Sequence, residues 1–123
     1  MNDTALHELK NRALCASDLD AAFCRGVTRL YKHYMGLRFA QYLAVLPSHR
    51  YKCCTGKVTH KSVGDTAKGK HIRVDNAEVK ALSSKAFADM VQGDVALVLF
   101  IGKKAVAMPT PHTVEAERYT GIF

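Results

Sequence analysis

Glu78 and Lys80 stand two residues apart in a short segment, 78–82, that we expect to be a β-strand. Because successive side chains of a strand point to opposite faces, these two side chains would share one face of a sheet. A carboxylate in that position can bind Mg²⁺, and a neighbouring ammonium group can steady an attacking water molecule. Asp65, thirteen residues before Glu78, would supply a second carboxylate. The spacing predicts Asp65, Glu78 and Lys80 as candidate catalytic residues with Mg²⁺ as cofactor; an exposed ion pair is the simpler alternative.

The Glu-x-Lys spacing resembles that of metal-dependent nucleases of the PD-(D/E)xK family. The elements that follow are similar in order: an expected helix over 84–91 and an apolar strand over 95–101. The chain departs from the family pattern where Gly64, rather than a proline, precedes the upstream aspartate. The resemblance implies cleavage of nucleic acid with a divalent metal ion, and Glu8 is a further candidate carboxylate.

Two histidines and two cysteines, His49, Cys53, Cys54 and His60, form a second candidate cluster. Imidazole and thiolate groups are the ligands that zinc prefers in a tetrahedral site. Adjacent cysteines on a strand point to opposite faces, so a single ion can take both only if the chain turns between them. Without such a turn we expect no metal site, but one buried cysteine, one exposed cysteine and two surface histidines.

A third arrangement needs no metal. In outline the chain resembles small basic ribonucleases, which place helices before an antiparallel sheet that carries a glutamate base, cationic phosphate ligands and a late histidine acid. Glu78 would be the base, Arg73 and Lys80 the phosphate ligands, and His112 the acid. An imidazole suits this role because it exchanges a proton near neutral pH.

The positive charge is concentrated in the middle of the chain. There are 18 Lys and Arg against 11 Asp and Glu, a net charge of +7. Segment 48–82 holds eight basic residues against three acidic ones and so carries +5 of that charge. A clustered positive field attracts polyanions, and an aromatic ring among cations can stack on a base. We therefore expect a sequence-independent nucleic-acid contact through Arg50, Tyr51, Lys52, Lys57, Lys61, Lys68, Lys70 and Arg73.

Binding to a protein is the main alternative function. The same basic segment could dock on an acidic protein surface, in the manner of an inhibitor, an adaptor or an assembly subunit such as a phage-encoded regulator. An alternating stretch over 113–119 predicts an edge strand through which copies of the chain could associate. Spaced motifs for nucleotide phosphates, dinucleotides, zinc proteases and serine hydrolases are missing from the sequence. We therefore favour binding over catalysis and expect no cofactor.

The chain is expected to form one α+β domain over residues 1–123, with N-terminal helices followed by a mostly antiparallel sheet with one inserted helix. Its three parts are a helical segment 1–47, a basic strand and loop segment 48–82, and a segment 83–123 of one helix and apolar strands.

Finer features are expected from periodicity and turn residues. The helices are placed over 4–14, after Ser17, over 37–46 and over 84–91. The strands are placed as a pair over 51–60 around a Thr55-Gly56 turn, over 71–74 and 78–82 around an Asp75-Asn76 turn, and over 95–101 and 105–108. A polar loop is expected over 63–70.

The composition is that of a globular domain, with 48% hydrophobic and 24% charged residues. The longest apolar run, Val95–Ile101, is too short to span a bilayer. Four cysteines without a disulfide spacing, and acidic residues where a leader would be basic and apolar, predict a reducing compartment. We therefore expect a cytoplasmic protein with no membrane partner.

Overall fold

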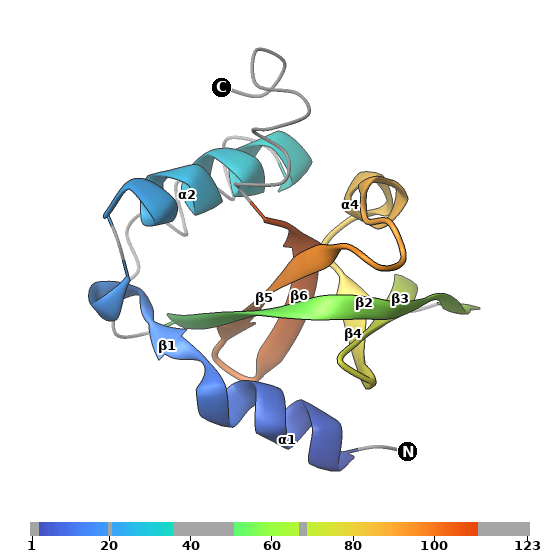
Figure 1. The fold of residues 1–123 in the computed structure, drawn as a ribbon. Helices are drawn as coiled ribbons and strands as arrows, with labels where there is room; N and C mark the ends of the chain where they lie inside the picture. The colour runs from blue at the N-terminus through green and yellow to red at the C-terminus, as the bar shows by residue number, and fades with distance from the viewer. Residues whose placement is uncertain (1–2, 20, 36–50, 67–68, 111–123) are drawn as a thin grey trace.

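The computed structural model describes residues 3–19, 21–35, 51–66 and 69–110. Helices and short elements come first and a sheet follows (Figure 1). The elements in chain order are α1 (Asp3–Arg12), β1 (Leu14–Cys15), the 3-10 turn η1 (Ala16–Asp18), α2 (Ala21–Met35), β2 (Tyr51–Thr66), β3 (Gly69–Val74), β4 (Ala77–Ala81), α4 (Ser84–Asp89), β5 (Val95–Ile101) and β6 (Lys104–Pro109).

Five of the strands close into a barrel. They are hydrogen-bonded in the order β2-β3-β4-β6-β5, and β5 pairs with β2 to complete the ring. Neighbouring strands are antiparallel except β4 and β6, which run parallel. The long strand β2 closes the barrel, because its residues 51–57 pair with β5 and its residues 58–66 pair with β3. The short β1 lies beside the start of β2, opposite Lys52 and Cys53.

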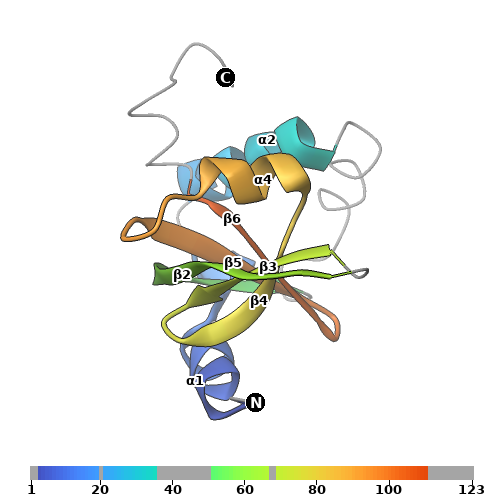
Figure 2. The same ribbon diagram turned by 90° about the vertical axis from the view of Figure 1, so that its right-hand side faces the viewer.

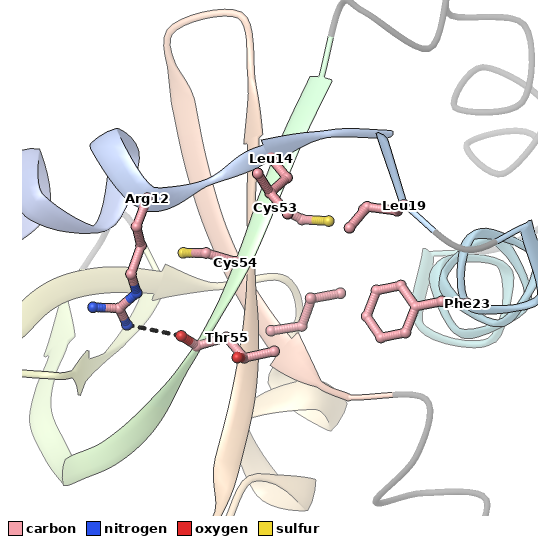
Figure 3. Close-up of a pocket in the computed structure, with 8 residues that line it drawn as sticks. Arg12, Leu14, Leu19, Phe23, Cys53, Cys54 and Thr55 are labelled. Atoms are coloured by element: carbon pink, nitrogen blue, oxygen red, sulfur yellow. Dashed lines mark hydrogen bonds between the residues drawn. The ribbon is translucent and has the colours of Figure 1, made fainter. Parts of the chain in front are cut away.

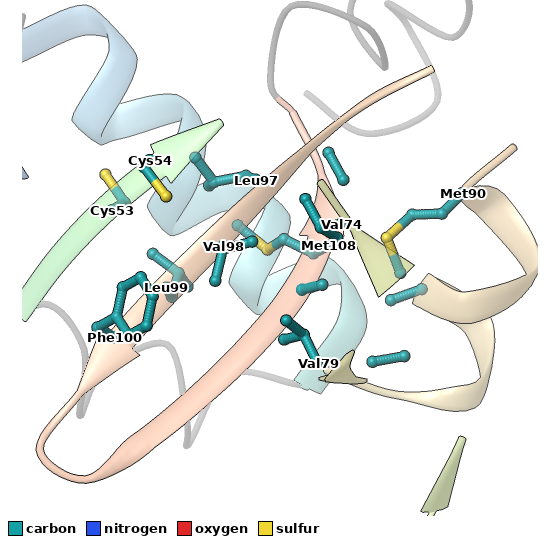
Figure 4. Packing of buried hydrophobic residues seen from close by; sticks show 14 of the residues in the cluster. Cys53, Cys54, Val74, Val79, Met90, Leu97, Val98, Leu99, Phe100 and Met108 are labelled. Carbon is teal, nitrogen blue, oxygen red and sulfur yellow. The ribbon is translucent and has the colours of Figure 1, made fainter. Parts of the chain in front are cut away.

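Apolar side chains fill the barrel and the layer outside it (Figure 4). On β4 burial alternates, so that Ala77, Val79 and Ala81 face inward. Five consecutive residues of β5, 96–100, are all buried. Because alternate side chains of a strand point to opposite faces, β5 must be covered on both sides. Its outer cover includes α2, since Leu97 lines a hollow together with Phe23.

The helices lie on two opposite sides of the barrel, α1 on one and α2 with α4 on the other (Figures 1 and 2). The Tyr34 hydroxyl donates a hydrogen bond of 2.9 Å to the Asp89 carboxylate, which joins α2 to α4. Ser83 caps α4, its hydroxyl accepting from the Ala86 N–H at 3.1 Å. The buried stripe of α2 has helical spacing and comprises Gly26, Val27, Leu30, Tyr31 and Tyr34.

The expected α+β class is confirmed, as is a mostly antiparallel sheet. In chain order α4 follows β4 and precedes β5. The apolar run predicted as a strand is β5 with the same bounds. The expected turn between β3 and β4 is also present, with positive φ at Asp75 (50°) and Asn76 (68°). Two positive φ values are those of a type I′ turn, which fits the twist of a hairpin.

Three expected features are wrong. The strand pair over 51–60 is one continuous strand, because Gly56 serves close packing rather than a turn: a Cβ there would lie 2.6 Å from Val74 Cγ1. The polar loop over 63–70 is mostly strand, since β2 continues to Thr66 and β3 begins at Gly69. The first third is not purely helical, because β1 adds to the sheet.

Some expected features lie outside the described residues. These are the helix over 37–46, the edge strand over 113–119, and the side chains of His49, Arg50, Lys68 and His112.

Candidate functional site

Five polar side chains share the outer surface of β2, β3 and β4. The strand register pairs Arg73 with Glu78 and His71 with Lys80, and it places His60 beside Arg73. Residues paired across strands project to the same face of a sheet. We call this set, His60, His71, Arg73, Glu78 and Lys80, the β3–β4 face. His71 is half-buried and the other four side chains are exposed.

In the part of the chain that the structure describes, the helices cover other parts of the barrel and leave the β3–β4 face open. The outward residues of β5 and β6, Leu97, Leu99 and Met108, are fully buried. On β4, by contrast, the outward Glu78 and Lys80 are exposed while their neighbours are buried. This alternation is typical of a sheet with one face on the core and one in water. The prediction that Glu78 and Lys80 share one strand face is confirmed.

Two lysines of the basic segment meet at α4. The ammonium groups of Lys61 and Lys70 lie 5.2 Å and 5.1 Å from the centroid of the Phe87 ring. Lys61 also donates a hydrogen bond of 3.1 Å to the carbonyl oxygen of Ala88. Cation–π contacts at these distances are attractive. They hold two positive charges at the α4 end of β3.

The other basic residues lie further away. Lys57 is exposed next to the β3–β4 turn, where its carbonyl accepts from the Asp75 N–H. Lys52 is exposed near the start of β2, beside β1 and β5. Val58 pairs with Val74, the neighbour of Arg73 on β3, and Lys52 lies six positions before Val58 on β2. Six strand positions span roughly 20 Å at about 3.3 Å per residue. The structure therefore divides the basic segment and places Lys52 well away from Arg73.

Tyr51 does not belong to this surface. Its side chain is only 7% exposed, in the core cluster, and its burial raises the pKa of the phenol. The predicted base-stacking role of Tyr51 therefore finds no exposed ring. Lys61 and Lys70, by contrast, have an aromatic partner in Phe87.

The strand register separates the backbone positions of Asp65 and Glu78, the two acidic residues of the expected metal site. Asp65 pairs with Lys70, whereas Glu78 pairs with Arg73, three residues further along β3. At about 3.3 Å per residue this is roughly 10 Å along the strand, and β3 lies between the two positions. Among the described side chains, no group of three His, Cys, Asp or Glu is placed to hold a metal ion.

The two adjacent cysteines point to opposite sides of β2, Cys53 toward Leu19 and Cys54 toward Arg12 (Figure 3). Both are buried and free, at 3% and 9% exposed. The expectation of one exposed cysteine is therefore wrong, because β2 is covered on both sides here. Burial raises the pKa of Cys53 to about 12 and also raises the pKa of Cys54. Both thiols remain protonated, which disfavours metal binding and nucleophilic chemistry.

A hollow of about 230 Å³ lies between α1, β1, α2, β2 and β5. Its lining is mostly apolar, with one guanidinium and two protonated thiols (Figure 3). The lining residues are Arg12, Leu14, Leu19, Phe23, Cys53, Cys54, Thr55 and Leu97. The Arg12 guanidinium is already engaged, since it donates to the Thr55 carbonyl at 2.8 Å and pairs with Asp75.

Asp75 holds α1 and β2 to the β3–β4 turn. Its carboxylate accepts from Arg12 and, at 2.9 Å, from the Lys57 N–H. Partial burial alone would raise the pKa of Asp75, but these two donors outweigh it and hold the pKa below its ordinary value. The same contact raises the pKa of Arg12. The charges of this contact are therefore satisfied locally and serve the fold rather than the β3–β4 face.

No family model, no curated protein and no solved structure matches this chain. The barrel topology is nevertheless specific. Five strands in the order β2-β3-β4-β6-β5, closed by β2 and β5, with a parallel β4–β6 pair and a helix between β4 and β5, have the connectivity of the OB-fold. In that numbering β3 and β4 are the second and third barrel strands. This likeness rests on connectivity alone.

Among the described residues, none of the helices has the length and apolar character needed to cross a membrane.

The sequence did not predict that His60 and His71 belong to the β3–β4 face. The sequence predicts His60 only as a zinc ligand and assigns no role to His71. Their common face depends on the β2–β3 and β3–β4 register, which joins residues far apart in the chain. The alternation of apolar residues at 72, 74, 77 and 79 is the signal that could have placed His71 outward.

Proposed function

We propose that this protein binds nucleic acid on the β3–β4 face, mainly through phosphate contacts. The observation that carries the proposal is the position of Arg73 and Lys80, exposed on the uncovered outer surface of the second and third strands of an OB-type barrel. Those strands carry the ligand face in OB-folds, together with the loops between strands one and two and between strands four and five. The function is therefore inferred by analogy with other proteins of this fold.

Charge around the face supports the same function. Lys61 and Lys70 add positive charge at the α4 end of β3. Lys103 and Lys104, both exposed, stand at the turn between β5 and β6, which corresponds to the loop between strands four and five. Contacts between cations and phosphates do not depend on base identity and release counterions. Binding should therefore be independent of sequence and should weaken steeply as salt rises.

The test compares two charge reversals of equal size. Fluorescence anisotropy is measured with labelled single- and double-stranded DNA and RNA between 50 and 300 mM salt. The double variant Arg73→Glu/Lys80→Glu should weaken binding about tenfold or more and lower the slope of log K against log salt by about 1.4 for single strands. The control Arg25→Glu/Lys52→Glu changes the net charge equally, on α2 and at the start of β2.

The outcomes separate the alternatives. Equal weakening by both double variants would show a diffuse charge effect and would overturn the assignment to this face. Affinity that does not change with salt would overturn the phosphate mechanism. No binding at 50 mM salt, together with an acidic protein that co-purifies with the chain, would replace this function with protein binding.

A further inference from the structure

Four side chains at the centre of the β3–β4 face form the corners of a quadrilateral. Arg73 stands directly opposite Glu78, and His71 stands directly opposite Lys80. Directly opposed residues of an antiparallel pair have Cβ atoms about 5 Å apart, and diagonal neighbours are about 7–8 Å apart. Within the described part of the chain, no ion pair within 4.0 Å joins Glu78 to Arg73 or Lys80. Its carboxylate is thus available to a ligand.

The two diagonals of this quadrilateral carry different chemistry. Arg73 and Lys80, the two cations, occupy one diagonal, and Glu78 and His71, the two proton-transfer groups, occupy the other. A phosphodiester above the centre would have a cation on either side to neutralise its non-bridging oxygens. It would also have a base and an acid on opposite sides of phosphorus, where an in-line displacement needs them.

We propose that the β3–β4 face cleaves RNA by this arrangement; the inference rests on the proposed binding of nucleic acid there. Glu78 takes the proton of a ribose 2′-hydroxyl, whose oxygen forms a bond to the adjacent phosphorus. The bond from phosphorus to the 5′-oxygen breaks with its electron pair, and His71 in its protonated form donates a proton to that oxygen. The products are a 2′,3′-cyclic phosphate and a free 5′-hydroxyl, and proton exchange with water restores both residues.

RNA is the substrate class because its nucleophile is internal. The 2′-oxygen is already next to the phosphorus, so the face has to supply only proton transfer and charge stabilisation. DNA lacks this hydroxyl and should bind without being cut.

The experiment uses a short DNA oligonucleotide that contains a single ribonucleotide, labelled with a fluorophore and a quencher, in buffer with EDTA. The full-length protein should cleave it only at the ribonucleotide, and mass spectrometry should find the cyclic phosphate and the 5′-hydroxyl. All-DNA and 2′-O-methyl versions should remain intact. Glu78→Gln and His71→Asn should each lower the rate about 100-fold or more. Both variants should bind the 2′-O-methyl version with an affinity within threefold of the wild type.

Matched controls separate this site from contamination and from misfolding. His7→Gln, an exposed histidine on α1, should keep the wild-type rate. Arg73→Ala/Lys80→Ala should reduce both cleavage and binding. Equal cleavage by wild type, Glu78→Gln and His71→Asn would trace the activity to a contaminant and overturn the proposal. Cleavage that EDTA abolishes would overturn it in favour of metal chemistry.

Failure of this proposal is distinguishable from failure of the binding proposal. Wild-type protein that binds the 2′-O-methyl oligonucleotide tightly but leaves the ribonucleotide intact would overturn cleavage and leave binding in place. Protein that binds none of the oligonucleotides at 50 mM salt would overturn both.

Discussion

Gly56 shows how a single residue can be misread from its type. Glycine next to threonine suggests a turn, yet here β2 passes through it without interruption. A Cβ at this position would lie 2.6 Å from Val74 Cγ1 and 2.9 Å from the Asp75 carboxylate. The missing side chain lets β2 approach β3 closely where its partner changes from β5 to β3. The glycine is therefore required by packing between strands.

We predict that Gly56→Ala lowers the free energy of unfolding by about 1–3 kcal/mol, because the added methyl overpacks the contact with Val74. Urea denaturation followed by circular dichroism measures the change. Val74→Ala removes the clashing Cγ1 atom, so the cost of Gly56→Ala should be smaller in that background. An equal cost in both backgrounds would contradict the steric explanation.

At the scale of elements, the β3–β4 hairpin is defined by its turn. Asp75 and Asn76 both have positive φ, which non-glycine residues rarely adopt. Asn tolerates this region better than most side chains. The turn sets the register that pairs Arg73 with Glu78, and so it determines the arrangement of the β3–β4 face.

Two substitutions at Asn76 should therefore have different effects. Asn76→Ala should cost about 1 kcal/mol of unfolding free energy, because alanine at a φ of 68° places its Cβ unfavourably. Asn76→Gly should leave the stability unchanged or raise it, since Asp-Gly is a preferred type I′ pair. Thermal and urea unfolding of both variants measure the difference. Equal stability of the two would show that backbone conformation is not what the turn requires.

Local patterns predict elements whose signal is local. The apolar run of β5 and the Asp75-Asn76 turn were both readable in the sequence. The closure of the barrel was not, because pairing of Tyr51 with Ile101 joins residues fifty positions apart and leaves no local mark. β1 was absorbed into a helix because two residues carry no periodicity.

The candidate site shows the same difference between local signals and long-range strand pairing. The shared face of Glu78 and Lys80 followed from a spacing of two residues on one strand. The position of His71 opposite Lys80 needed the β3–β4 register, and that of His60 beside Arg73 needed a second register that contains a β-bulge. Charge counts along the chain could not separate Lys52 from Arg73, because both belong to one basic segment and are divided only by the fold.

At the scale of the whole molecule, the described helices cover some sides of the barrel and leave the β3–β4 face exposed. α2 and α4 lie on one side of the barrel and α1 on the opposite side (Figure 2). The outward side chains of Arg73, Glu78 and Lys80 on β3 and β4 are exposed. The Arg12–Asp75 pair connects residues 63 positions apart and fixes α1 to the barrel. Because α1 precedes the barrel strands in the chain, this contact makes the stability of the barrel and of the N-terminal segment interdependent.

We predict that this contact gives the molecule part of its acid sensitivity. The pKa of Asp75 in the folded protein lies below its ordinary value of 3.8, so folding favours the ionised carboxylate. The stabilisation is therefore complete above about pH 5 and is lost as the pH falls through the lower, folded-state pKa. Since the Arg12 and Asp75 side chains are 47% and 34% exposed, the contribution is about 1 kcal/mol or less.

The measurement is urea unfolding of the wild type and of Asp75→Asn from pH 7 down to pH 2. Asn accepts the positive φ of this position, so the substitution removes the charge and leaves the turn in place. The wild type should be the more stable protein at pH 7, and the two free energies should converge near pH 2. Asp18→Asn, the same charge change on η1, serves as the control for the higher net charge of +8 that each variant has in place of +7. If Asp75→Asn runs parallel to the wild type over the whole range, the contact does not couple protonation to folding.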